Sequence, residues 1–209
     1  HIYKKELIEI TKIGLPAGIQ GSIFSISNVL IQSSINKFGT TAINGNSAAQ
    51  SIEGFVYISM NSVYHASLAF VGQNMGVKKY HNIHKITWYC LILVGVVLGG
   101  SLFLCGRYVS RIYTDVPGEI DVSYIRLHYL CLPYFLCGIM DVMVGVLRGL
   151  GYSITPMIVS IIGVCVFRVF WIYLIFYNVT DFSNYNDLHY LYMSYPISWI
   201  VTFAVEYLI

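Results

Sequence analysis

An acidic residue, Asp141, lies well inside a long apolar stretch of the sequence, residues 124–148. Such a stretch is long enough to cross a bilayer, because about 20 helical residues at a rise of about 1.5 Å span a hydrocarbon core of about 30 Å. A carboxylate at the centre of a membrane helix costs roughly 2.5–3.5 kcal/mol, and it therefore usually faces a partner or a water-filled cavity. We predict that Asp141 handles a cation or a proton.

The helical face that carries Asp141 consists of small and polar residues. Tyr134, Gly138, Gly145 and Arg148 share this face, since their spacing from Asp141 follows the helical repeat. Small and polar groups suit close helix packing or the wall of a cavity better than contact with lipid.

Two further charged residues, Glu53 and Arg168, lie inside other apolar stretches. The helix rise places Arg168 about 21 Å and Glu53 roughly 21–27 Å from the membrane side on which the chain begins, and Asp141 only about 10 Å from it. Depth therefore favours a Glu53–Arg168 ion pair and leaves Asp141 as the freer carboxylate. A structural salt bridge that fixes helix register is the alternative interpretation of this pair. We keep Glu53, with Asp141, as a candidate for cation or proton coupling.

Polar residues also follow one side of the stretch that contains Glu53. Tyr57, Asn61 and His65 succeed it at steps of four residues, which places all four on an arc of about 120°. A weaker stripe in the preceding stretch consists of Gly21, Ser25, Asn28, Gln32 and Asn36. Polar groups in hydrocarbon need partners, so the two stripes either enclose a wet cavity or bond the helices together.

The buried charges favour the cavity. Its predicted lining residues are Arg168, Tyr57, Asn61, His65, Tyr134, Asn28 and Gln32. His65 is interpreted as a hydrogen-bonded member of the stripe rather than a metal ligand, so no metal site is expected.

The composition is that of an integral membrane protein. Hydrophobic residues make up 56% of the 209 residues and charged residues 11%, with a mean hydropathy of +0.67, whereas soluble domains carry about 25% charged residues. A net charge of +2 without a basic, aromatic cluster gives no reason to expect nucleic acid as a partner. HExxH and GxSxG motifs are absent and only one Asp is buried, so the sequence does not predict an intramembrane enzyme or a cofactor.

The sequence predicts an all-α polytopic membrane protein, a single domain over residues 1–209 with six transmembrane helices. The expected spans are 13–36, with Pro16 in its opening turn, 47–71, 86–105, 124–148, 154–177 and 192–209. Glycine and proline, including Gly39 and Gly45, supply the punctuation between spans.

The distribution of Lys and Arg predicts the orientation, because cytoplasmic loops carry the excess of positive charge. Seven such residues lie on the N-terminal side, Lys4, Lys5, Lys12, Lys78, Lys79, Lys85 and Arg148, and four on the other, Lys37, Arg107, Arg111 and Arg126. We therefore expect a multi-pass protein of the cell (inner or plasma) membrane with a cytoplasmic N-terminal end. The opposite orientation stays open, since the bias is not steep.

Several motifs occur in an order that resembles one transporter family. They are GLPAGIQGSIFSISNVLIQSSINKFG (14–39), SAAQSIEGFVY (47–57), VGQNMGVKKY (71–80) and LPYFLCGIMDVMVGVLRGLGYSITPMI (132–158). Together they resemble the C-terminal half of bacterial multidrug and toxic compound extrusion (MATE) transporters. The GQNMG segment and the LRGLG–TP connection are the most specific pieces.

The resemblance implies that this chain is one six-helix lobe of a twelve-helix protein, with the lipid bilayer and a missing N-terminal lobe of the same chain as partners. It further implies exchange of Na⁺ or H⁺ for cationic, lipophilic small molecules. Many members carry a glutamate in the first helix of this lobe, where this sequence has only the earlier Glu6 and Glu9. Their fourth-helix acid aligns near Cys137, one turn before Asp141, so Asp141 and Glu53 replace that site or coupling occurs in the missing lobe.

The favoured function is therefore a secondary antiporter, whose cavity walls, including Tyr57, Met60, Tyr134 and Met143, contact the cation. Gly72, Gln73, Asn74 and Gly76 are interpreted as a cytoplasmic hinge or turn, with permissive glycines and with Gln and Asn capping helix ends. One alternative is a flippase for lipid-linked saccharides, for which a ring of arginines is expected and only Arg168 is available. The other is a non-transporting membrane scaffold or receptor.

Overall fold

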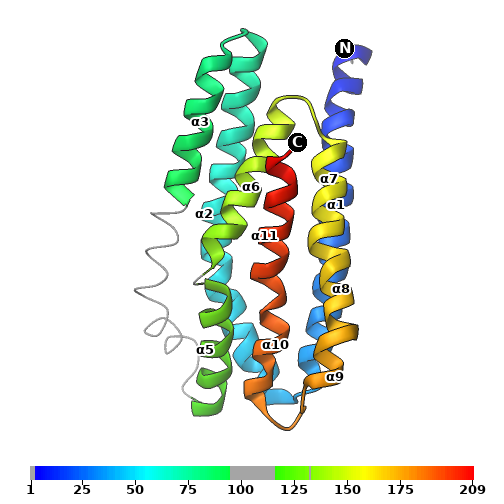
Figure 1. The fold of residues 1–209 in the computed structure, drawn as a ribbon, viewed down its shortest axis with the longest axis vertical. Coiled ribbons are helices and arrows are strands. Elements are labelled where there is room, and N and C mark those ends of the chain that lie inside the picture. The colour runs from blue at the N-terminus through cyan, green and yellow to red at the C-terminus, as the bar shows by residue number, and fades with distance from the viewer. Residues whose placement is uncertain (1–2, 95–115, 132) are drawn as a thin grey trace.

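The computed structural model describes residues 3–94, 116–131 and 133–209. These residues form helices that pass side by side along the long axis of the molecule, and no strand occurs among them (Figure 1). The predicted fold class, an all-α membrane helix bundle, is thereby confirmed.

The described residues form six helical runs. The first three runs are α1 (Lys4–Asn36), α2 (Thr40–Gly76) and α3 (Tyr80–Ile92), and the fourth combines α5 (Pro117–Cys131) with α6 (Tyr134–Gly149). The fifth run joins α7 (Ile154–Ser160), the π-helical η2 (Ile161–Val166), α8 (Phe167–Trp171), the π-helical η3 (Ile172–Phe176) and α9 (Tyr177–Val179). The sixth follows a 3₁₀ turn, η4 (Tyr185–Asp187), and consists of α10 (Leu188–Tyr192) and α11 (Ser194–Tyr207).

The first two helices are longer than the spans predicted from apolar character. Helix α1 begins at Lys4 because the Glu- and Lys-rich lead-in consists of good helix formers, so Pro16 lies inside the helix and not in its opening turn. Helix α2 likewise extends the predicted span 47–71 at both ends, and Gly45 lies within it rather than between spans. Of the predicted span 86–105, the part after residue 94 lies outside the described residues.

The predicted span 124–148 is not one straight helix. Helices α5 and α6 meet at an angle of 48°, and Pro133 occupies the position that precedes α6. Proline has no backbone N–H to donate within a helix, which accounts for the break.

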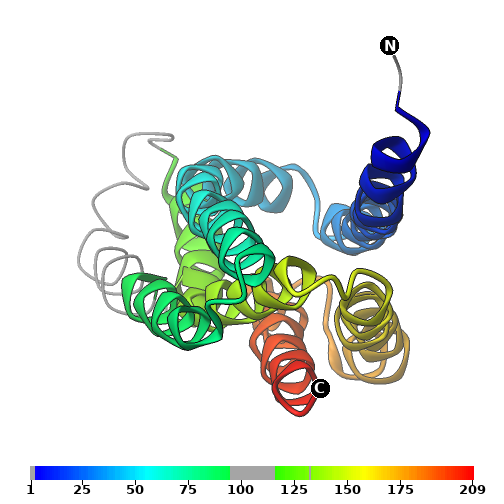
Figure 2. The ribbon, with the colours of Figure 1, turned by 90° about the horizontal axis from the view of Figure 1, so that it is seen from above.

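The connections place the chain ends on one side of the bundle. The N-terminus, the α2–α3 turn, the α6–α7 loop and the end of α11 lie toward one end, and the α1–α2 and α9–α10 connections lie at the other (Figure 1). Seen along this axis, α1 lies beside the α7–α9 run, while α2 packs against α5 and α6 (Figure 2). Which end faces the cytoplasm stays a prediction.

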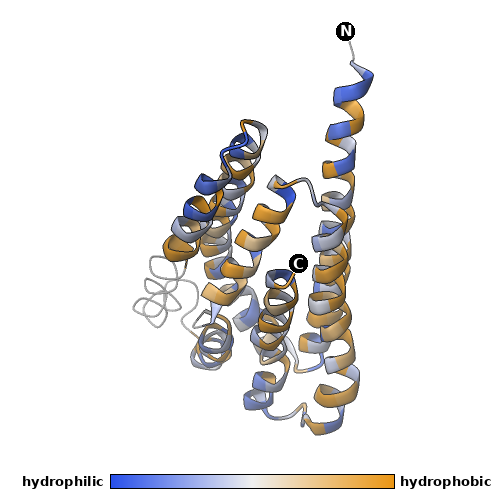
Figure 3. Cartoon of the chain, turned by 45° about the horizontal axis from the view of Figure 1, so that its top comes forward, coloured by the Kyte–Doolittle hydropathy of each residue, from blue (hydrophilic) through white to orange (hydrophobic). Residues whose placement is uncertain are grey.

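Large apolar side chains cover the outside of the bundle. Ile162, Phe170, Tyr173 and Leu174 of the fifth run are each more than half exposed, and the same run is coloured as hydrophobic over most of its length (Figure 3). By length and hydropathy, α1 and residues 154–179 qualify as membrane spans, and α5 with α6 qualifies if the bent pair is one span. An apolar exterior of this extent is typical of lipid-facing helices.

Candidate functional site

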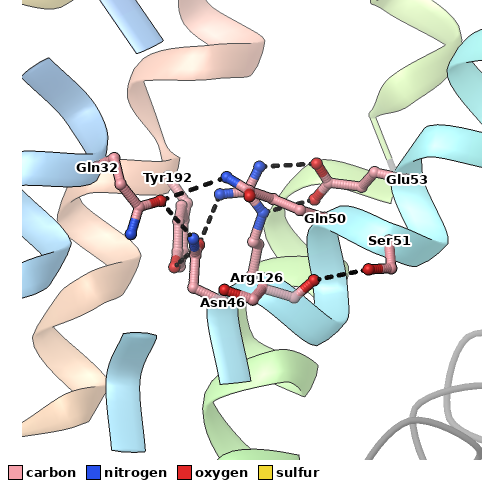
Figure 4. Close-up of polar contacts among 8 residues, drawn as sticks. Gln32, Asn46, Gln50, Ser51, Glu53, Arg126 and Tyr192 are labelled. Atoms are coloured by element: carbon pink, nitrogen blue, oxygen red, sulfur yellow. Dashed lines mark hydrogen bonds and ion pairs between the residues drawn. The ribbon is translucent and has the colours of Figure 1, made fainter. Parts of the chain in front are cut away.

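The best-connected polar site in the bundle is an ion pair between Arg126 of α5 and Glu53 of α2. Nε of Arg126 donates to Oε1 of Glu53 and Nη2 to Oε2, each at 2.7 Å, which is bidentate geometry. The third donor group, Nη1, donates to Oδ1 of Asn46 at 2.6 Å. Figure 4 shows these contacts. Arg126 is only 4% exposed and Glu53 7%, so the pair is shielded from solvent.

The same network reaches two further helices through Asn46. Its Oδ1 also accepts from the hydroxyl of Tyr192 in α10 at 3.1 Å, and its Nδ2 donates to Oε1 of Gln32 in α1 at 2.9 Å (Figure 4). Gln32 in turn donates to Asn36 at 3.0 Å. This network therefore ties α1, α2, α5 and α10 together in the half of the bundle away from the N-terminus.

The predicted Glu53–Arg168 pair is wrong. Arg126 was assigned to the outer end of a span, whereas α5 begins at Pro117 and carries Arg126 into the bundle interior, level with Glu53. Arg168 instead donates from Nε to the hydroxyl of Ser198 at 3.1 Å, and its guanidinium lies 3.9 Å from the ring centre of Tyr195. Between described residues, the one ion pair is thus Glu53–Arg126.

The α6 face around Asp141 is closely packed. Close helix packing was one of the two predicted uses of this face, and a cavity wall was the other. A Cβ on Gly138 would collide with Val94, and a Cβ on Gly145 would collide with Ser67. Asp141 itself is half-buried and forms no hydrogen bond or ion pair with the described residues. Of the two predicted coupling residues, Glu53 is paired with Arg126, whereas Asp141 forms no ion pair with an arginine among the described residues.

Arg148, at the end of this face, forms a second buried polar cluster. Nη1 donates to the hydroxyl of Tyr64 at 2.5 Å and Nη2 to Oε1 of Gln20 at 2.6 Å, which links α6 to α2 and α1. Arg148 is 6% exposed. The sequence places it on the face of Asp141 and at a span end, but does not predict its burial in a polar cluster. In the sequence, only its place in the LRG motif pointed to a special role for Arg148.

The sequence analysis also missed a buried carboxylate, Glu206 of α11. Its Oε1 accepts a hydrogen bond from the hydroxyl of Ser160 in α7 at 3.0 Å, and the residue is 1% exposed. An acidic residue inside the apolar run 192–209 was the available signal.

The predicted cavity-lining residues lie in different environments. Tyr57, His65 and Asn28 are exposed and Asn61 is half-buried, whereas Gln32 belongs to the Arg126 network. Tyr134 is buried with its ring 5.5 Å from that of Trp199, and the guanidinium of Arg168 lies 5.8 Å from the same Trp199 ring. The structure therefore joins Gln32 with Glu53, and Tyr134 with Arg168, and leaves the rest of the α2 stripe outside both groups.

The GQNMG segment is helical rather than a turn. Gly72, Gln73, Asn74 and Gly76 form the last turns of α2, and the reversal follows at residues 77–79, where Lys78 has a φ of 58°. The side chain of Asn74 accepts from Asn82 of α3 at 3.1 Å, so it ties the two helices together across the turn. Among the described residues, no group of three or more His, Cys, Asp or Glu side chains is placed to hold a metal ion.

Comparisons with known proteins show what this chain is similar to. The family model MatE matches residues 16–174. Probable multidrug resistance protein NorM of Thermotoga maritima is 27% identical over 164 residues, which are 77% of this chain and 35% of that protein. Multidrug resistance protein MdtK of Photorhabdus laumondii is 29% identical over 180 residues, 82% of this chain and 36% of that protein.

Probable multidrug resistance protein YoeA of Bacillus subtilis is 21% identical over 209 residues, 98% of this chain and 44% of that protein. The chain thus spans between about a third and somewhat under half of these relatives' length. A solved MOP superfamily transporter from Pyrococcus furiosus superposes with a TM-score of 0.82 at 14% identity, over 95% of this chain and 43% of that one. This likeness concerns the fold.

Proposed function

Since the chain belongs to the MatE family, we propose that it forms part of a secondary antiporter that exports cationic, lipophilic drugs or toxic compounds in exchange for Na⁺ or H⁺. The proposed partners are the lipid bilayer and a second lobe of the same protein, which together with this one encloses the substrate path. The proposed location is the cell membrane, with the N-terminal end of the chain in the cytoplasm. Relatives named as multidrug resistance proteins support this assignment.

The observation that carries the coupling proposal is the state of Asp141. It lies on α6 inside the bundle, half-buried, with no bonded partner among the described residues. A carboxylate in that position is costly unless a cation, a proton or water reaches it. Glu53, by contrast, has a permanent counter-charge in Arg126, which favours a positioning role for Glu53 in this lobe.

We expect Asp141→Asn to reduce gradient-driven transport by at least about tenfold, which corresponds to about 1.4 kcal/mol. The amide keeps the size of the side chain but removes the charge that binds the coupling ion. The measurement is the initial rate of ethidium efflux from vesicles that contain the full-length protein, under an imposed Na⁺ or H⁺ gradient and at matched protein levels.

Glu9→Gln is the matched control, since it removes an exposed carboxylate at the start of α1, and it should leave the rate unchanged. Wild-type rates in Asp141→Asn would show that this carboxylate does not couple transport. A wild-type protein that transports nothing under either gradient would instead favour a non-transporting scaffold or receptor.

A second candidate, a flippase for lipid-linked saccharides, is favoured by the number of buried arginines. The expectation that only Arg168 is available was wrong, because Arg126 and Arg148 are buried as well. However, Arg126 is paired with Glu53, and Arg148 donates to Tyr64 and Gln20. Arg168 donates to Ser198, so each of these three arginines already has a protein partner. Flipping of a fluorescent lipid-linked saccharide without ethidium efflux would select this function.

A further inference from the structure

The carboxylate of Glu206 is the most completely buried acidic group that the proposed mechanism leaves unused. The residue is 1% exposed, and only one of its oxygens is bonded: Oε1 accepts from Ser160 at 3.0 Å. The other oxygen, Oε2, has no hydrogen-bond partner in the part of the chain that the structure describes. Buried polar atoms without a partner are uncommon, and each one needs a physical explanation.

The local backbone brings this carboxylate and the Ser160 hydroxyl together. Gly163 of η2 allows α11 to approach so closely that a Cβ at this position would collide with Thr202. A π-helical stretch, η2, begins at Ile161, directly after Ser160. Such stretches are rare and frequently occur at functional sites.

The charged groups that act on Glu206 come from α6. They are Asp141 and Arg148, while α7 contributes the uncharged Ser160 hydroxyl. Arg148 already donates to Tyr64 and Gln20, so it is not bonded to Glu206. The titratable group of η2, Cys165, interacts with Ser27 and Arg168 instead.

This environment fits a proton better than a metal cation. A charged carboxylate at such a position is costly without a bonded cation, and protonation removes the charge. A metal cation is held by several oxygen ligands, about six for hard cations such as Ca²⁺ and Mg²⁺, whereas a proton needs only one carboxylate oxygen. Beside the carboxylate, the described residues offer one hydroxyl within hydrogen-bond distance.

We propose that Glu206, held by Ser160, is a proton-binding site of this lobe, separate from Asp141, and that it exchanges its proton with water during the transport cycle. The proton binds to Oε2 of the carboxylate, and on release the carboxylate regains its negative charge. This inference rests on the proposed antiport and narrows the coupling ion at this position to H⁺.

The test is infrared spectroscopy of the purified full-length protein, titrated from about pH 5 to about pH 10, the range in which buried carboxyl groups titrate. The wild type should show a carboxylic acid C=O band that disappears as the pH rises, and Glu206→Gln should lack one carboxyl group's share of it. Ser160→Ala should keep the band but raise its frequency, because the hydrogen bond to the carbonyl oxygen is lost. Glu9→Gln, an exposed control, should leave the band unchanged.

The spectra need no transport, so the two proposals fail separately. A wild-type band that Glu206→Gln leaves intact, or a Glu206 band that does not change with pH, would overturn the proton site even if ethidium efflux is normal. A titrating Glu206 band in a protein without efflux would support the proton site and contradict the proposed transport function.

Discussion

Replacement of Arg126 by methionine is expected to lower the free energy of unfolding by roughly 3–5 kcal/mol, the range found when one partner of a buried ion pair is removed. The substitution leaves the carboxylate of Glu53 buried and without its two hydrogen bonds of 2.7 Å. It also removes the hydrogen bond that Oδ1 of Asn46 accepts from Arg126 at 2.6 Å. Thermal unfolding of the detergent-purified full-length protein should show a clearly lower midpoint.

A double variant separates lost pairing from lost packing. In Glu53→Gln combined with Arg126→Met, no unpaired charge remains, so most of the lost stability should return. Lys85→Met removes an exposed positive charge from α3 and should change stability by no more than about 0.5 kcal/mol. If Arg126→Met unfolds at the wild-type midpoint, the pair does not stabilise the bundle in the way its geometry indicates.

The ion pair also shows how far the sequence predicts this site. The apolar stretches predict the helices, and the four-residue spacing places Glu53 on a polar face of α2. Asn46 lies seven residues before Glu53 on the same face, so the spacing also predicts that Asn46, a second member of the Arg126 network, belongs to this polar face. Helix periodicity therefore predicts which side of one helix is polar.

The partner of Glu53 could not be predicted from depth alone. Depth along a helix follows from the distance to its end, and the end of α5 was misplaced because its first turns are polar. Pro117, a residue type favoured at the first position of a helix, was the signal that places Arg126 inside the bundle. Even with correct ends, a sequence does not state which neighbouring helices face each other.

Glu206 and Arg148 illustrate the same limit at helix ends. Both stand near the ends of apolar runs, where charged residues usually reach water, and both are buried here by neighbouring helices. Their burial depends on contacts between α11 and α7 and between α6 and α1. Such contacts join residues far apart in the sequence, so local sequence patterns do not predict them.

The second large effect is expected at Gly45, which the sequence analysis placed between two spans. Gly45 lies inside α2, and an ideal Cβ there would be 2.5 Å from the carbonyl oxygen of Glu119 and 2.8 Å from Cβ of Val122. These are backbone and branch-point atoms of α5, which cannot rotate away. Gly45→Ala should therefore push α2 and α5 apart and cost about 1–3 kcal/mol of unfolding free energy, the range for overpacking.

Gly54→Ala in the same helix is the matched control, because a Cβ there has no neighbour within 4 Å. It should leave the protein as stable as the wild type or raise its stability by about 0.5–1 kcal/mol, since alanine favours a helix over glycine. Equal stabilisation by both substitutions would show that α2 and α5 are farther apart than the structure places them. Because Arg126 reaches Glu53 across this same contact, Gly45→Ala should also reduce the stability lost in Arg126→Met when the two are combined.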